Sequence, residues 1–171
     1  IYDTAASNPA PEAIYQLGYA CYKTGDIDRA ITGFSKVSHL ESAIGQNASY
    51  YLASCYIKKG DKENARKGFA SASRSDFDPV IKQDAMFNYA LVTFEIGGDP
   101  FTDAIKAFED YITTYPASKN LNEAHRLLVQ AYLAARNYKS ALVSIEKIEN
   151  KNDELKEAYQ RIAYGRGVEL Y

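Results

Sequence analysis

Tryptophan is absent from this 171-residue sequence, methionine occurs once, and cysteine and histidine occur twice each. Two cysteines cannot build the set of disulfides that stabilises small secreted domains. Cys21 and Cys55 lie in apolar periodic stretches, so we expect buried free thiols there. His39 and His125 lie far apart, and neither has Cys, Asp or Glu at the spacing of a recognisable metal motif. The sequence therefore predicts no metal site, no cofactor, and histidines that are hydrogen-bonded or solvated.

Charge of one sign and long hydrophobic runs are also lacking. The 20 Lys and Arg residues nearly balance the 22 Asp and Glu residues, which leaves a net charge of −2. A field this weak does not neutralise many phosphates, so nucleic acid is not an expected partner. No run of 18 apolar residues and no basic-then-apolar leader is present. We therefore expect a soluble chain without a membrane-spanning segment.

Motifs that carry catalysis are missing as well. The sequence contains no G-x-S-x-G, no Walker-type phosphate loop and no G-x-G-x-x-G. The glycines of Gly165-Arg166-Gly167 lie in a predicted helix and not in a phosphate-binding loop. Carboxylate pairs such as Glu109-Asp110 fit a solvated helix surface better than a shared buried site. The sequence therefore predicts a protein that is not an enzyme.

What the sequence does contain is a pattern that occurs four times and then begins a fifth time. Its most regular positions are alanines that recur every 35 to 39 residues, each followed four residues later by Phe or Ile: Ala30, Ala65, Ala104 and Ala141. Small residues also recur about a dozen residues before the first three of these alanines, at Gly18, Ala53 and Ala90. Apolar residues around both sets follow helical spacing, so each copy predicts two amphipathic helices that cross closely at the small residues.

Turn and capping residues separate the predicted helices. Gly25-Asp26 and Gly60-Asp61 each supply a left-handed residue that ends one helix and a side chain that caps the next. Asp78 and Pro79 predict the cap and first position of a later helix, after a longer connection over 73–78. Further turns are predicted at 97–100, where two residues are inserted, and at Arg136-Asn137. There Arg-Asn replaces Gly-Asp, and Asn can enter the left-handed region and can also cap a helix. After Pro116, we expect Ser118 to cap the next helix.

With its Leu-Gly, Tyr, Ala and Phe positions, the pattern resembles the tetratricopeptide repeat. This resemblance implies an all-α fold, an α-α superhelix or solenoid of antiparallel helix pairs. The single array is expected to consist of units at about 11–42, 43–78, 79–118 and 119–152, with a half unit at 153–171. Residues 1–10 are expected to be the tail of a preceding unit or a linker, and Gly167 to be the small position of the last helix. The missing start Met and the half unit suggest a piece of a longer array.

The resemblance also implies a concave groove, lined by the first helix of each unit, that binds a protein or peptide. The positions that it assigns to this groove include Tyr15, Tyr19, Tyr22, Tyr50, Tyr51, Phe87, Asn88, Leu91, Arg126 and Gln130. Tyr and Phe are well suited to such an interface because they offer large rigid surfaces. The alternative for each tyrosine is that it packs between helices as core. Capture of a free carboxylate is not expected, because the matching positions, which include Asp84, hold no cation.

A looser resemblance concerns repeat proteins of Gram-negative cell envelopes, including outer-membrane assembly lipoproteins. It is carried by Ala104 to Phe108, Tyr115 to Ser118 and Glu123-Ala124. It implies a bacterial scaffold in an envelope assembly, in the periplasm or at the outer membrane. Two other functions remain open: a structural spacer or a segment that self-associates through the uncovered last helix, and glycan binding by the aromatic groove.

Overall fold

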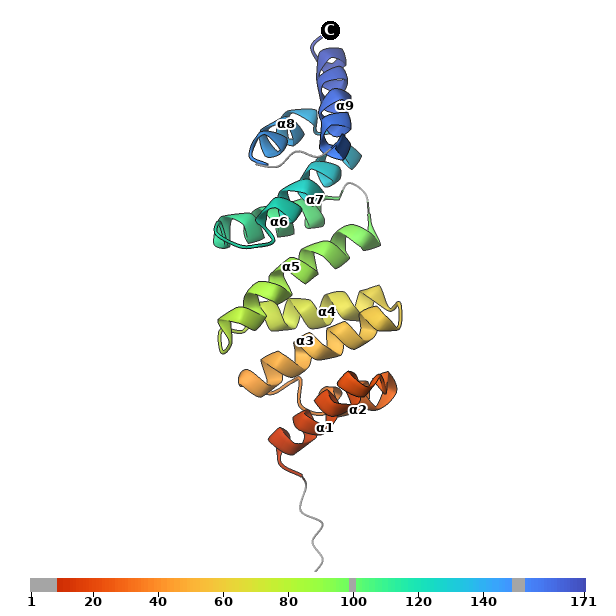
Figure 1. Ribbon diagram of the computed structural model, residues 1–171, viewed down its shortest axis with the longest axis vertical. Coiled ribbons are helices and arrows are strands. Elements are labelled where there is room, and N and C mark those ends of the chain that lie inside the picture. The colour runs from red at the N-terminus through yellow and green to blue at the C-terminus, as the bar shows by residue number, and fades with distance from the viewer. Residues whose placement is uncertain (1–8, 99–100, 149–152) are drawn as a thin grey trace, which may run out of the picture. The chain divides into compact units, whose positions relative to one another are not determined.

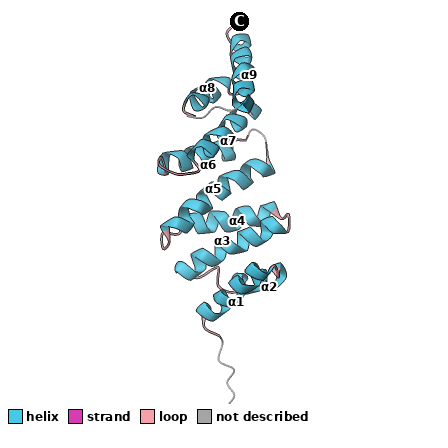
Figure 2. Cartoon of the chain, viewed as in Figure 1, coloured by secondary structure: helices cyan, strands magenta, loops and turns pink. Residues whose placement is uncertain are grey.

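In the computed structural model, residues 9–98, 101–148 and 153–171 are described, and they form nine helices and no strand (Figures 1 and 2). The helices are α1 (Pro11–Thr24), α2 (Ile27–Ser35), α3 (Ala43–Lys58), α4 (Lys62–Arg74), α5 (Pro79–Ile96), α6 (Thr102–Thr114), α7 (Leu121–Ala134), α8 (Tyr138–Glu146) and α9 (Asp153–Glu169). The predicted all-α class and the repeated helix pairs are confirmed. Residues 1–8 of the tail or linker predicted at 1–10, and residues 99–100 of the turn predicted at 97–100, lie outside the described residues.

The chain divides into two compact units, Ile1–Ala85 and Met86–Tyr171, and the division falls within α5. In the first unit, α1 packs on α2, α3 packs on α4, and α3 also contacts α1 and α2. In the second unit, α7 packs on α6 and α8, and α9 packs on α8 and α7. The predicted boundaries of the individual repeats remain predictions.

The predicted turns between paired helices are confirmed in the first unit. Gly25 and Gly60 adopt left-handed backbones with φ of 86° and 76°. The Asp26 carboxylate then accepts a hydrogen bond from the backbone N–H three residues later at the start of α2, and Asp61 does the same for α4. Asp78 likewise accepts from two backbone N–H groups at the start of α5. Local sequence thus sets where these helices begin and end.

Small residues lie where paired helices cross, as predicted. A Cβ on Gly18 of α1 would lie 3.2 Å from the ring of Phe34 in α2, and one on Gly33 would lie 3.0 Å from the Gly18 Cα. In the next pair, a Cβ on Gly68 of α4 would lie 2.8 Å from the Cβ of Ala53 in α3. The backbones approach so closely that even one added methyl group must displace a neighbour.

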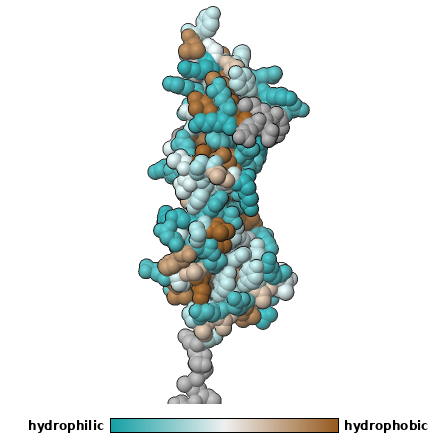
Figure 3. Space-filling model, turned by 60° about the vertical axis from the view of Figure 1, so that its left-hand side comes forward, coloured by the Kyte–Doolittle hydropathy of each residue, from teal (hydrophilic) through white to brown (hydrophobic). Residues whose placement is uncertain are grey.

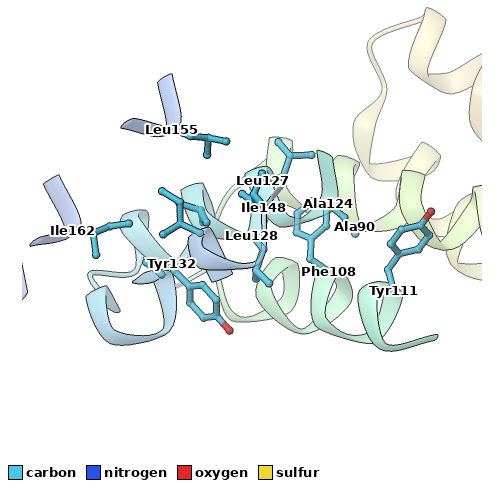
Figure 4. Packing of buried hydrophobic residues seen from close by; sticks show 13 residues of the cluster. Ala90, Phe108, Tyr111, Ala124, Leu127, Leu128, Tyr132, Ile148, Leu155 and Ile162 are labelled. Atoms are coloured by element: carbon cyan, nitrogen blue, oxygen red, sulfur yellow. The ribbon is translucent and has the colours of Figure 1, made fainter. Parts of the chain in front are cut away.

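Each unit has its own hydrophobic core. The first is built around Ala30, Phe34, Val37, Ala48 and Cys55, with many half-buried side chains around them. The second contains more fully buried aliphatic residues. Figure 4 shows several of these, among them Leu127, Leu128, Ile148, Leu155 and Ile162, together with Phe108, Tyr111 and Tyr132. Cys55 is buried as predicted, and burial raises the pKa of its thiol to about 11, whereas Cys21 is only half-buried.

Two local predictions about the second unit are wrong, and a third is confirmed in part. The small position of α9 is Gly165, whose Cβ would lie 2.6 Å from the ring of Tyr138, whereas Gly167 faces open space. Ser118 does not cap α7, because the helix begins after Asn120; its hydroxyl instead accepts from the Asn120 N–H and bonds to the Tyr111 hydroxyl at 2.6 Å. At the turn before α8, Asn137 caps the helix as predicted, whereas the left-handed residue is Arg136, with φ of 55°.

Candidate partner-binding surfaces

The five groove tyrosines that the sequence predicts in the first unit come together in space. Their rings form one group, here called the tyrosine cluster: Tyr15, Tyr19 and Tyr22 of α1, and Tyr50 and Tyr51 of α3. Helical spacing explains the arrangement, since residues 15, 19 and 22 follow one face of α1. The α1–α3 contact then brings the second helix against that face.

Tyr51 lies at the centre of the tyrosine cluster. Its ring centroid is 5.0 Å from that of Tyr19, 5.4 Å from Tyr22 and 5.3 Å from Tyr50. On its other side, the ring stacks on the buried Phe34 at 5.9 Å. All five tyrosines are half-buried, so each packs against the core with one part and leaves another part accessible. Each ring is therefore partly core and partly accessible, and that it binds a partner remains a prediction.

Charged groups border the tyrosine cluster. The Lys58 ammonium lies 4.1 Å from the ring centroid of Tyr22, and the Lys23 ammonium lies 5.3 Å from that of Tyr19, both within the range of cation–π contacts. Burial raises the pKa of Tyr51 well above its usual value, and the neighbouring hydroxyl of Tyr19 adds to this. Burial and the charge of Asp84 raise the pKa of Tyr50. Both hydroxyls therefore remain protonated at neutral pH and keep a hydrogen that they can donate.

The groove residues predicted in the second unit are also half-buried, but they are less alike. Phe87 and Leu91 of α5 pack against the core of that unit, and the Phe87 ring lies 5.3 Å from the ring of Tyr111. Arg126 donates hydrogen bonds from two nitrogens to both carboxylate oxygens of Glu123, which lowers the Glu123 pKa. Asn88 and Gln130 complete the set. That these residues bind a partner remains a prediction.

The search for motifs missed a second surface. A cleft of about 640 Å³ lies between α6, α7 and α8, and His125 lies in its wall. His125 is 5% exposed, and its Nδ1 is buried without a hydrogen-bond partner in the described part of the chain, so the prediction of a hydrogen-bonded or solvated histidine is wrong for this nitrogen. The signal for this cleft in the sequence is the four-residue spacing of Lys139 and Val143 in α8 and of Lys147 at its C-cap.

Residues 9–98, 101–148 and 153–171 contain no group of three or more His, Cys, Asp or Glu side chains placed to hold a metal ion. Within the same residues, no helix combines the length and the apolar character that crossing a membrane requires.

Comparisons with known proteins agree with the repeated helix pairs. The family model for the tetratricopeptide repeat matches residues 47–74 and 84–118. One similar crystal structure contains the nearly identical TPR-like repeats of a putative kinesin light chain from Podosopora anserina. It aligns with a TM-score of 0.64 and 13% identity, over 95% of this chain and 92% of that one. A single-substitution form of the same protein aligns with a TM-score of 0.63 and 12% identity, over 95% and 89%. No curated protein matches.

Identities this low show that the fold is shared, and they do not show a shared function. Tetratricopeptide repeats generally mediate protein–protein interactions and are generally not catalytic. The chain therefore has a TPR-like all-α repeat fold, and its segments 47–74 and 84–118 match the family model for the tetratricopeptide repeat.

Proposed function

We propose that the chain is a non-catalytic interaction scaffold and that its tyrosine cluster binds a segment of a partner protein. The observation that carries this proposal is the contiguous group of five half-buried tyrosines on α1 and α3. Rigid aromatic side chains that are already packed lose little conformational freedom when a partner covers them. Lys23 and Lys58 at the border, together with protonated hydroxyls, add polar contacts around this apolar surface.

A peptide selection followed by a binding measurement tests this proposal. Peptides of about 12 residues, long enough to span an interface of several hot spots, are selected on the immobilised chain from a random display library and measured by fluorescence polarisation. Tyr19→Ala and Tyr22→Ala are expected to weaken binding by about 30-fold each, the loss of about 2 kcal/mol that is typical of interface hot spots. Tyr159→Ala and Tyr164→Ala remove exposed tyrosines of α9 and serve as matched controls. Unchanged affinity in folded Tyr19→Ala and Tyr22→Ala variants would rule out the tyrosine cluster.

Self-association is the second candidate function, because α9 exposes large hydrophobic side chains. Tyr164 is 78% exposed and Val168 is 61% exposed. Figure 3 shows hydrophobic surface near the C-terminal end on the face that it draws. Light scattering over a range of concentrations would detect this association, and the double variant Tyr164→Ser with Val168→Ser should abolish it. A monomer at high concentration would exclude it.

Two further points of the proposal concern the place and the ligand. The scaffold would act within an envelope assembly, and the alternative ligand for the aromatic surface is a glycan. The segment from Ala104 to Ala124 supports the former by resemblance, and the exposed aromatic surface supports the latter. Fractionation of cells that express the full reading frame tests the location. A glycan array tests the sugar alternative, in which the same Tyr19→Ala variant should lose the signal.

A further inference from the structure

The cleft between α6, α7 and α8 lies in the second unit and shares no residue with the tyrosine cluster. Its volume of about 640 Å³ lies within the range of about 300 to 1,000 Å³ that ligand sites occupy. Leu128 of α7 and Ile112 of α6 supply its apolar surface. The cleft therefore has the size and the apolar surface of a ligand site.

The polar groups of the α7 wall are buried. His125 is 5% exposed, with an unpartnered Nδ1, and a buried polar atom of this kind is costly to leave without a hydrogen bond. Burial and the charge of Lys147 lower the pKa of His125, so its ring is neutral at neutral pH and retains both a donor and an acceptor. The Tyr132 hydroxyl, which lies at the edge of the core cluster in Figure 4, donates to the Glu109 carboxylate of α6.

The α8 wall carries positive charge. Lys139 and Val143 of α8 and the C-cap residue Lys147 follow one another at intervals of four residues and therefore lie on one side of the helix. Val143 is 50% exposed between the two lysines. In the part of the chain that the structure describes, neither lysine has a carboxylate partner. The opposite wall holds the carboxylate of Glu109, so a ligand with acidic groups would turn these toward α8.

The spacing of the lysines sets the shape of such a ligand. Eight residues of helix separate Lys139 from Lys147, which is about 12 Å at about 1.5 Å per residue. A ligand that pairs with both lysines in an outstretched conformation must span this distance. In an extended peptide, residues i and i+4 point to the same side and lie about 13 Å apart. The residue at i+2 points to that side as well and would reach Val143.

We propose that this cleft binds an extended peptide segment of a partner protein that carries acidic side chains at positions i and i+4 and an aliphatic side chain at i+2. The two acidic side chains pair with Lys139 and Lys147, and the aliphatic one covers Val143. The segment would then lie against the wall that contains His125. This site is independent of the tyrosine cluster, and either one can fail without the other.

A defined peptide tests the inference. The probe is a fluorescein-labelled peptide with blocked ends in which Asp, Leu and Asp alternate with Ser, and its affinity is measured by fluorescence polarisation. Lys139→Gln and Lys147→Gln should each weaken binding about fivefold, the upper range for exposed ion pairs, and Glu109→Gln should strengthen it by removing a repelling charge. Lys106→Gln, on α6 outside the cleft, should leave it unchanged. Moving the second Asp to i+2, or replacing both with Asn, should also weaken binding.

Nitrogen NMR of the two histidine rings locates the peptide. Bound peptide should shift the ring signals of His125 and leave those of His39, in the first unit, in place. The inference is overturned if the peptide does not bind at millimolar concentration, if the Asn version binds equally well, or if binding leaves His125 unshifted. Loss of binding in Tyr19→Ala, with Lys139→Gln unaffected, would also overturn it and would assign the peptide to the tyrosine cluster.

Discussion

The two units pack the same kind of helix pair with different residues. The first brings its backbones into close contact through Gly18, Gly33 and Gly68, and leaves the aromatic side chains of the tyrosine cluster half-buried. The second buries aliphatic residues of α7, α8 and α9 almost completely. The glycine contacts join α1 to α2 and α3 to α4, whereas the tyrosines pack between α1 and α3. The first unit thus has an aromatic surface, and the second has a cleft with buried polar groups in its wall.

The two units also use different hydrogen bonds to hold the connection between successive helix pairs. In the first unit, the amide of the buried Gln46 donates to the carbonyls of Ala72, Ser75 and Asp78 and accepts from the Asp78 N–H, and so holds the segment between α4 and α5. In the second, a hydroxyl pair, Tyr111 and Ser118, holds the segment between α6 and α7.

The largest effect is expected at Gly45 in α3. A Cβ at this position would lie 1.9 Å from the carbonyl oxygen of Leu40, and a backbone atom cannot move aside as a side chain can. Gly45→Ala should therefore lower the free energy of unfolding by about 3 kcal/mol, the upper range for overpacking. Urea unfolding followed by circular dichroism measures this. In the second unit, Gly167→Ala of α9 meets nothing within 4 Å and should be neutral or stabilising.

Gln46→Leu is expected to rank next. The substitution keeps the volume but leaves the Asp78 N–H and three carbonyls without their side-chain partner, a loss of about 2 kcal/mol. Urea unfolding gives the stability, and hydrogen exchange of the Asp78 amide should accelerate. Gln160→Leu on the exposed surface of α9 is the matched control. A Gln46→Leu variant as stable as the unmodified chain would contradict this account of the α4–α5 connection.

Tyr111→Phe should cost less than Gln46→Leu, because it removes one hydrogen bond of 2.6 Å and keeps the buried ring. We expect a loss of about 1 kcal/mol in urea unfolding. Ser118→Ala in the Tyr111→Phe background should add less than it costs alone, since the shared bond is already absent. Full additivity of the two substitutions would show that the hydroxyl pair is not coupled.

Much of the fold is predictable from local sequence. The Gly25-Asp26 and Gly60-Asp61 turns and the buried alanines Ala30 and Ala65 follow from backbone preference and from spacing, and both signals lie within a few residues of each other. The grouping of Tyr15 with Tyr51 also follows once the helix pairs are placed. The half-burial of these tyrosines does not, since it depends on how closely α1 and α3 approach.

The second surface was missed for a different reason. The surroundings of His125 come from residues that are distant in the sequence, Glu109 on α6 and Lys147 after α8, so no local motif marks the site. The prediction that Gly167, and not Gly165, is the small position of α9 is wrong for the same reason. Both glycines lie in the same helix, and only the ring of Tyr138 on α8 decides which of them must be small.

The smallest effect is expected at the turns. Arg136 adopts a left-handed backbone at the position where the first unit uses Gly25, and such a conformation strains a side chain that has a Cβ. Because glycine also loses more conformational freedom on folding, Arg136→Gly should stabilise the chain by only about 0.5 kcal/mol. Gly25→Ala should destabilise it by a similar amount, although nothing lies within 4 Å of its added Cβ. Thermal unfolding of both variants measures these opposite signs, and equal signs would show that backbone strain is not what distinguishes the two turns.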